Sequence, residues 1–285
     1  MAPDAFEATM GAFPLSGPSS PGENGLGNMI ADALRYAGTA GKAAPTAGPL
    51  RSAGNAVPAC PPVPEFTIGA FATGVIRDPL IASQKVAFAD LFAVVPLGIT
   101  TATDQTNSYP GYPLLKVYLT GSEIWDMCKF DALIIQYNLF TDDFMHLSGI
   151  QFTHNGAGVV GNVQKYAPAD YNCIGGTTAL AKDSTPYPVI IDSYVMAMLL
   201  SPSTQSLLTA LGISVVPKLS DYSTPVSTSN MLSTRLDKDS NISNGVQEEY
   251  AWSALLGYFT YLSAVIPADP YNLSTTTHKR IILVP

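Results

Sequence analysis

Charged side chains are scarce in this sequence. Only 13% of its 285 residues are Asp, Glu, Lys or Arg, and the formal net charge is −8. A nucleic-acid-binding domain needs a basic face that releases counterions from phosphates, and anionic membrane surfaces attract basic clusters. The composition therefore excludes nucleic acid as a partner and disfavours a membrane surface, although one or two Arg residues could still hold a small anion.

Long hydrophobic runs and a leader-like N-terminus are also missing. No apolar run reaches the ~18 residues that a membrane span needs, so we expect no span. Residues 1–13 have neither the basic region nor the apolar region of a signal peptide. Low charge, few Lys and abundant Ser, Thr and Gly nevertheless favour an extracytoplasmic location, which could be periplasmic, secreted or on the cell surface.

Residue types that carry metal-dependent or nucleophilic chemistry are few and dispersed. The three histidines are His146, His154 and His278, and they form no ligand cluster. The three cysteines fit no zinc spacing, and no G-x-S-x-G elbow occurs. We therefore assign no catalytic residue, no metal ligand and no cofactor to this chain.

The cysteines allow at most one disulfide. Cys128 falls inside an expected amphipathic helix, where a core position is favoured over a nucleophilic role. Cys60 and Cys173 fall in expected loops. A Cys60–Cys173 bridge is therefore the expected pairing.

Hydrophobic residues make up 47% of the chain, enough to build a large core. Helical spacing of apolar residues predicts helices over 24–38, 120–137, 203–211 and 248–264, and a short helical or extended segment over 88–95. Apolar runs predict strands over 66–72, 114–119, 147–153, 187–195 and 281–284. Residues 1–22 are expected to be a linker or tail, and residues 23–285 a single α+β domain.

Two local patterns suggest binding sites but have plainer explanations. Gly156, Gly158 and Gly161 match the G-x-G-x-x-G spacing of dinucleotide-binding loops, but no helix follows to receive a pyrophosphate, so a glycine-rich hairpin is favoured. Asp142 and Asp143 could be paired carboxylates or a calcium ligand, but no third acid follows at ligand spacing. A solvated turn is the favoured interpretation.

Arg77 stands where a hydrophobic strand ends in a loop, a common place for ligand-binding groups. The alternative is that Arg77 pairs with a neighbouring carboxylate, Asp78 or Asp90. The residues alone leave the two roles open.

Short motifs occur in a particular order along the chain. Residues 23–34 read ENGLGNMIADAL, residues 72–77 read ATGVIR, and residues 86–98 read VAFADLFAVVPLG. A strand, Thr-Gly and helix pattern follows at 114–125, then HLSGIQF at 146–152 and YPVIIDSYV at 187–195. In this order they resemble the opening helix, N-G-G-G-I-R, V-L-P-F-G, T-G, Q-V-S-G-L and final-strand segments of the C-terminal domain of the 5′-nucleotidase and UDP-sugar hydrolase family.

The resemblance implies a layered sheet-and-helix fold and a division of labour. In this family an N-terminal domain carries two metal ions and hydrolyses the ester, while the C-terminal domain holds the nucleoside between two aromatic rings. The chain is then expected to be the substrate-binding type of domain from a secreted nucleotide phosphoesterase. Its partner would be a metallophosphatase domain, on the same or another chain, to which the metal ions would belong.

At the expected nucleoside site the chain departs from the family pattern. Arg77 is retained and Tyr194 falls at the second aromatic position, but Leu97 replaces the first stacking Phe. Thr73 replaces a glycine that lets a ligand approach the backbone, and residues 198–200 stand where G-G-D-G is expected. We expect an eroded site, weak or absent nucleotide binding, and no hydrolysis by this chain alone. The alternative is a non-catalytic exported binding or structural module that reuses the fold.

Overall fold

A mixed four-stranded sheet is the centre of the protein. The structure is a computed structural model that describes residues 8–10, 22–40, 66–81, 85–98, 110–166, 178–239, 243, 245–261, 265–266, 271, 273 and 279–284. The sheet order is β4 (Leu114–Thr120), β9 (Pro186–Asp192), β2 (Ile68–Ala72) and β5 (Met145–Ser148). β2 runs parallel to β9, while the two outer strands are antiparallel to their neighbours. All of β2 is buried, as expected for a strand covered on both faces.

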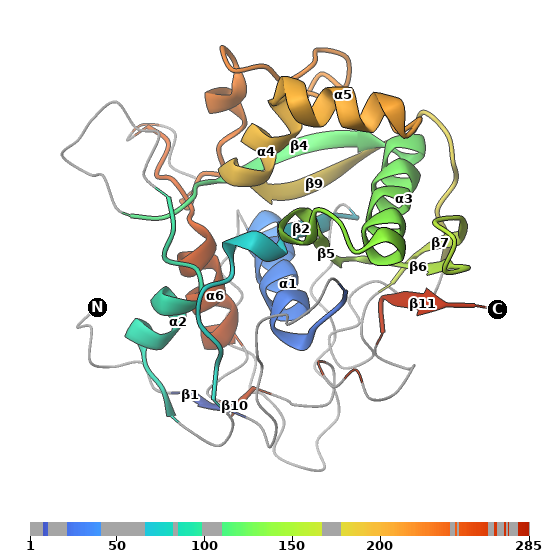
Figure 1. Cartoon of the computed structure of the whole chain (residues 1–285). Helices are drawn as coiled ribbons and strands as arrows, with labels where there is room; N and C mark the ends of the chain where they lie inside the picture. The colour runs from blue at the N-terminus through green and yellow to red at the C-terminus, as the bar shows by residue number, and fades with distance from the viewer. Residues whose placement is uncertain are drawn as a thin grey trace.

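Helices cover both faces of this sheet (Figure 1). On one face α1 (Gly25–Ala40) packs against β2, β5 and β9; α6 (Ala251–Tyr261) packs on α1, and α2 (Phe88–Val94) on α6. On the other face lie α3 (Gly121–Tyr137), α4 (Ser193–Leu200) and α5 (Pro202–Ala210). Strand alternation explains the two layers: Ile190 meets α1 at Gly38, while Val189 and Ile191 face α4 and α5.

Two further sheets flank the central one. The first has the order β11 (Ile281–Leu283), β6 (Ile150–His154), β7 (Val160–Lys165) and β8 (Thr178–Ala179). The second has the order β10 (Val265–Ile266), β1 (Ala8–Met10) and β3 (Lys85–Val86). Short 3-10 turns occur at Thr73–Val75 (η2), Thr141–Asp143 (η4) and Met231–Thr234 (η6). The architecture is α+β, as predicted.

Several local predictions are confirmed. The helix predicted over 120–137 is α3, and a capping box opens it: the Thr120 hydroxyl accepts from the Glu123 backbone N–H, and the Glu123 carboxylate accepts from the Thr120 backbone N–H. The glycine-rich segment forms a turn between β6 and β7, with Gly156 and Gly158 at φ +72° and +73°. It is a hairpin, not a dinucleotide-binding loop.

Four predicted boundaries are wrong. The segment 147–153 is two strands in two different sheets, because Gly149, at φ +87°, turns the chain between β5 and β6. The strand predicted to Val195 ends at Asp192, whose carboxylate accepts from the Val195 N–H and starts α4. The first helix continues past Gly38 to Ala40, and the last helix begins at Ala251 and not at residue 248.

The termini and the cysteines are described only in part. Ala8–Met10, placed in the expected tail, pair with β3 and β10, and the domain boundary at residue 23 stays a prediction. Cys128 is buried and unbonded, whereas the predicted Cys60–Cys173 bridge lies outside the described residues. In the described part of the chain, no helix combines the length and the apolar character that a bilayer crossing requires.

Candidate functional site

Thr73, one of the expected site residues, points into the protein. It begins η2 directly after β2, and its backbone N–H donates to the Phe144 carbonyl at 2.8 Å. Its hydroxyl lies 3.0 Å from His146 Nε2, which is also 3.0 Å from the Asn24 side-chain nitrogen. Burial, with a smaller effect of the Arg280 charge, lowers the pKa of His146 to about 3. The imidazole is therefore neutral near pH 7 and links η2 to the start of α1.

Arg77 is exposed and held by its backbone. Its N–H donates to the Val94 carbonyl at 2.9 Å, which ties the Arg77 loop to the end of α2, three residues before Leu97. The guanidinium donates to the adjacent Ile76 carbonyl, at 3.2 Å. Neither Asp78 nor Asp90 forms an ion pair with it in the described part of the chain. The geometry therefore gives no support to the carboxylate-paired alternative and leaves the charge available to solvent.

Tyr194, the expected stacking residue, already has an aromatic neighbour. It lies in the first turn of α4, and its ring centroid is 5.8 Å from that of Tyr112 at an interplanar angle of 49°. Gly98, which follows Leu97, lies against the same Tyr112 ring: a Cβ atom at Gly98 would be 2.6 Å from Tyr112 Cδ1. Tyr112 therefore contacts both the Gly98 backbone and Tyr194, which belong to the two sides expected to enclose a base.

The polar surroundings of Tyr194 are acidic. Burial raises the pKa of the Tyr194 hydroxyl, and the charges of Asp143 and Asp142 raise it further. Asp142 lies directly against η2, because a Cβ atom at Gly74 would be 2.8 Å from the Asp142 Cβ. Gly74 thus permits close packing of η4 against η2. A phosphate brought near Tyr194 would meet these carboxylates.

Asp192 adds a third acid beside Tyr194. It is fully buried at the end of β9, where one carboxylate oxygen accepts from the Val195 N–H at 2.8 Å. Burial raises its pKa to about 7, although hydrogen bonds from the Val195 and Tyr194 backbones lower it. Its role is to begin α4 and so to position Tyr194.

Comparison with known proteins identifies the fold. Residues 8–198 match the family described as the 5′-nucleotidase, C-terminal domain. The chain belongs to this family. No curated protein matches the sequence.

Solved structures agree with the assignment to the 5′-nucleotidase C-terminal-domain family. The 5′-nucleotidase precursor of Thermus thermophilus superposes with a TM-score of 0.52 at 14% identity, over 100% of this chain and 41% of its own. The NAD nucleotidase of Haemophilus influenzae superposes with a TM-score of 0.53 at 11% identity, over 98% of this chain and 38% of its own. Identities this low show the fold alone. The chain spans about two fifths of the length of these proteins.

The family's opening-helix motif is structural in this chain. Glu23 accepts from the backbone N–H groups of Arg280 and Ile281 at 2.7 and 3.0 Å, and from the Asn28 amide at 2.6 Å. Asp32 forms a buried ion pair with Arg280 at 2.7 Å. Gly27 gives room to the His146 ring, since a Cβ there would lie 2.2 Å from it. The motif therefore joins α1 to the C-terminal strand β11.

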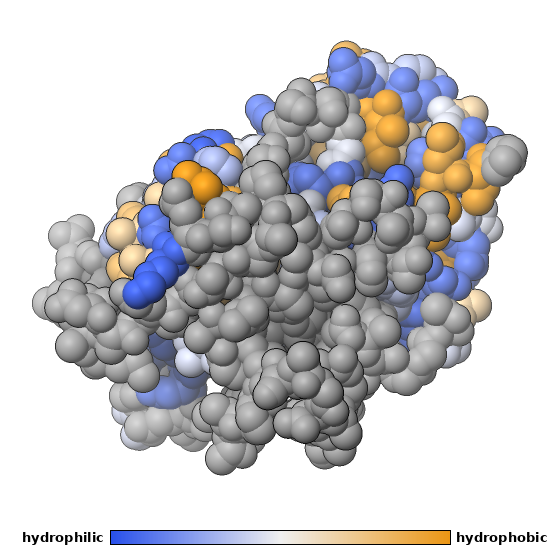
Figure 2. All heavy atoms as spheres, turned by 90° about the horizontal axis from the view of Figure 1, so that it is seen from below, coloured by the Kyte–Doolittle hydropathy of each residue, from blue (hydrophilic) through white to orange (hydrophobic). Residues whose placement is uncertain are grey.

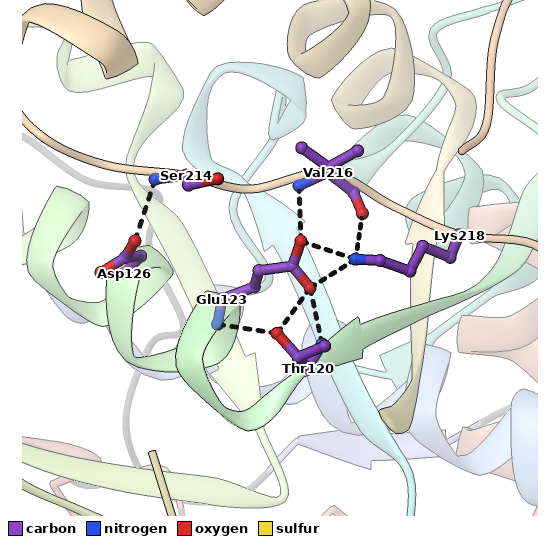
Figure 3. Close-up of polar contacts among 6 residues, drawn as sticks. All are labelled: Thr120, Glu123, Asp126, Ser214, Val216 and Lys218. Atoms are coloured by element: carbon purple, nitrogen blue, oxygen red, sulfur yellow. Dashed lines mark hydrogen bonds and ion pairs between the residues drawn. The ribbon is translucent and has the colours of Figure 1, made fainter. Parts of the chain in front are cut away.

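A second polar cluster holds α3 to the loop after α5 (Figure 3). Lys218 donates to both Glu123 oxygens at 2.7 and 2.8 Å, and the Val216 N–H donates to the same carboxylate at 3.1 Å. Asp126 accepts from the Ser214 N–H at 2.9 Å. Burial opposes ionisation of Glu123, but its hydrogen bonds with Lys218 and Thr120 lower its pKa overall. Every carboxylate oxygen of Glu123 is occupied by protein donors, so this cluster fixes structure.

Sequence reasoning missed Tyr112 and Arg280. Neither lies in a local motif, and each acts on residues far away in the chain: Tyr112 on Tyr194, and Arg280 on Asp32, 248 positions earlier. The described residues contain no group of three His, Cys, Asp or Glu side chains that could converge on a metal ion.

Proposed function

We propose that this chain is the substrate-binding type of domain of an exported 5′-nucleotidase-like phosphoesterase. The observation that carries the proposal is the family match over residues 8–198. The metal ions and the hydrolytic step would come from a metallophosphatase domain, encoded beside this sequence or on another chain. The neighbouring structures, which extend well beyond the matched region, support such a partner.

The nucleoside site of this domain is proposed to be eroded. Tyr112 contacts Tyr194, the expected stacking residue, and the charges of Asp143 and Asp142 act on the Tyr194 hydroxyl. These two observations favour a second candidate function. In this alternative the chain is an exported, non-catalytic module that keeps the fold of a nucleotide-hydrolysing family, as a pseudoenzyme does, and serves as a binding or structural domain. Low charge and few Lys support the exported location in both cases.

Magnitudes decide how weak nucleotide binding should be. A charge-assisted contact from Arg77 to phosphate contributes about 1.5–3 kcal/mol, and stacking on one aromatic face about 1–3 kcal/mol. Their sum of about 2.5–6 kcal/mol falls short of the ~8 kcal/mol that corresponds to 1 μM. We expect dissociation constants near millimolar or weaker for AMP, adenosine and UDP-glucose.

Calorimetric or NMR titration tests both parts of this proposal. Tyr112→Ala vacates the space beside Tyr194 and should strengthen adenosine binding by about 5–10-fold, since about 1–1.4 kcal/mol of stacking becomes available. The double variant Asp142→Asn with Asp143→Asn should strengthen the binding of AMP more than that of adenosine, because only AMP carries a phosphate. Tyr137→Ala, at an exposed tyrosine on α3, is the matched control and should change neither.

The wild-type titration can overturn the eroded-site proposal directly. Binding of any of these ligands below about 10 μM, abolished by Arg77→Ala or Tyr194→Ala, would make the domain a working nucleotide receptor. If Arg77→Ala lowers only the free energy of unfolding, Arg77 is structural.

A further inference from the structure

A small apolar cavity lies between the central sheet and the layer formed by α3, α4 and α5. Its volume is about 30 Å³, and no polar surface faces it. Val189 forms part of its floor, Met127 and Met145 part of its sides, and Met198, Leu199 and Thr204 part of its roof. It shares no lining residue with Thr73, Arg77, Leu97, Tyr112 or Tyr194.

The chemistry of the wall excludes water as a stable occupant. A buried water needs two to four polar partners, and apolar cavities without such partners stay dry and bind apolar molecules. The cavity's volume of about 30 Å³ is about a fifth of the roughly 150 Å³ of an apolar cavity that binds benzene, so the cavity itself takes roughly one or two carbon atoms. A longer apolar ligand has to continue outside it.

Helix α4, in the roof of the cavity, provides apolar surface on which a longer ligand can continue. α4 has the sequence SYVMAMLL, with apolar residues on every side after its first position. A helix of this kind is normally covered all round. Here Ala197 is exposed, and Met198, Leu199 and Leu200 are only half-buried. The apolar surface thus extends outward from the cavity on the α4 side of the molecule. Figure 2 shows the molecule from below, the side opposite to the one on which α4 and α5 lie in Figure 1.

We propose that this α4 cavity binds an unbranched aliphatic chain, with its terminal carbons inside the cavity and its next carbons across Met198 and Leu199. Methionine side chains are flexible and polarisable, so Met127, Met145 and Met198 can adjust to a chain that enters. The lining carries no charged side chain, and no polar surface faces the cavity to select a headgroup. The apolar tail of the ligand therefore determines the ligand class, and neither Arg77 nor Tyr194 lines the cavity.

The test is NMR of the full chain labelled at its methionine methyl groups, titrated with ethanol, 1-butanol and 1-hexanol below denaturing concentrations. The signals of Met127, Met145 and Met198 should shift, while that of Met29, buried in α1 on the other face of the sheet, should not. Affinity should rise by up to about fourfold for each methylene that becomes buried.

Two variants locate the site. Val189→Ile adds a methylene to the floor of the cavity and should weaken the binding of 1-hexanol about fourfold. Val159→Ile, the same change at an exposed turn, is the control and should not change the affinity. Leu199→Ala opens the roof and should move the preferred chain length upward, which keeps the proposal testable if Val189→Ile does not fold. Two results would overturn the proposal. One is equal shifts of the Met29 and Met145 signals, and the other is an affinity for 1-hexanol that neither Val189→Ile nor Leu199→Ala changes.

Discussion

Among single residues, Asp192 has the clearest predicted effect on stability. Burial raises its folded-state pKa to about 7 from an ordinary value of 3.8. The folded protein therefore binds this proton more tightly than the unfolded chain. The contribution of Asp192 to the free energy of unfolding should fall as pH rises between about 3.8 and about 7, and stay constant above that range.

Asp192→Asn removes the titration and keeps an oxygen that can accept from the Val195 N–H. We expect the variant to be more stable than the wild type at pH 8, by about 2–4 kcal/mol, and to lose part of the decline between pH 5 and pH 8. Urea unfolding at the two pH values measures both effects. Asp78→Asn, at an exposed carboxylate, is the control. A variant less stable than the wild type at pH 8 would mean that the fold needs the Asp192 charge.

At the scale of elements, the attachment of β11 to α1 depends on a charge inside the core. Arg280 is 1% exposed and donates to Asp32, to the Asn28 carbonyl at 3.1 Å and to the Leu147 carbonyl at 2.7 Å. Tyr271 also donates to Asp32, at 2.9 Å. Removing one partner of a buried pair leaves the other charge uncompensated.

Arg280→Met should therefore lower the free energy of unfolding by about 3–5 kcal/mol. The double variant Asp32→Asn with Arg280→Met should cost less than the sum of the single changes, because neither charge is then stranded. Denaturant unfolding of the full cycle measures this coupling, with Arg35→Met, at a half-buried arginine of the same helix, as control. Additive single changes would show that the two side chains are not coupled in solution.

The elements also show where sequence reasoning succeeds and where it stops. The start of α3 was predictable because the side chains of Thr120 and Glu123, only three positions apart, each accept a hydrogen bond from the other's backbone N–H. The division of 147–153 was not, because the packing at Gly149 involves a distant segment: an added Cβ would lie 2.7 Å from the Thr67 carbonyl oxygen. For the candidate site, Arg77 was expected from its place at the end of a strand and again from the family resemblance, and Tyr194 was expected from the resemblance alone. The occupation of the space beside Tyr194 by Tyr112 depends on long-range packing that no local pattern encodes.

For the whole molecule, the decisive property is the absence of converging metal ligands among the described residues. We predict that the purified chain holds well under one equivalent of zinc, manganese or iron and does not turn over AMP or a chromogenic phosphate ester. Elemental analysis and a phosphatase assay, with and without a chelator, measure this. About one bound equivalent together with chelator-sensitive turnover would contradict the prediction and assign catalysis to this chain.

The pairing of Arg280 with Asp32 also sets an order of events during synthesis. A ribosome releases the N-terminal part of the chain first, and 248 positions separate the two partners. At a synthesis rate of about 5–20 residues per second, roughly 12–50 s pass between the synthesis of Asp32 in α1 and that of its ion-pair partner Arg280. Until then the nascent chain holds an apolar helix face and a carboxylate without their C-terminal cover. The emergence of Arg280, and not that of the first helix, is the step that permits this domain to complete its core.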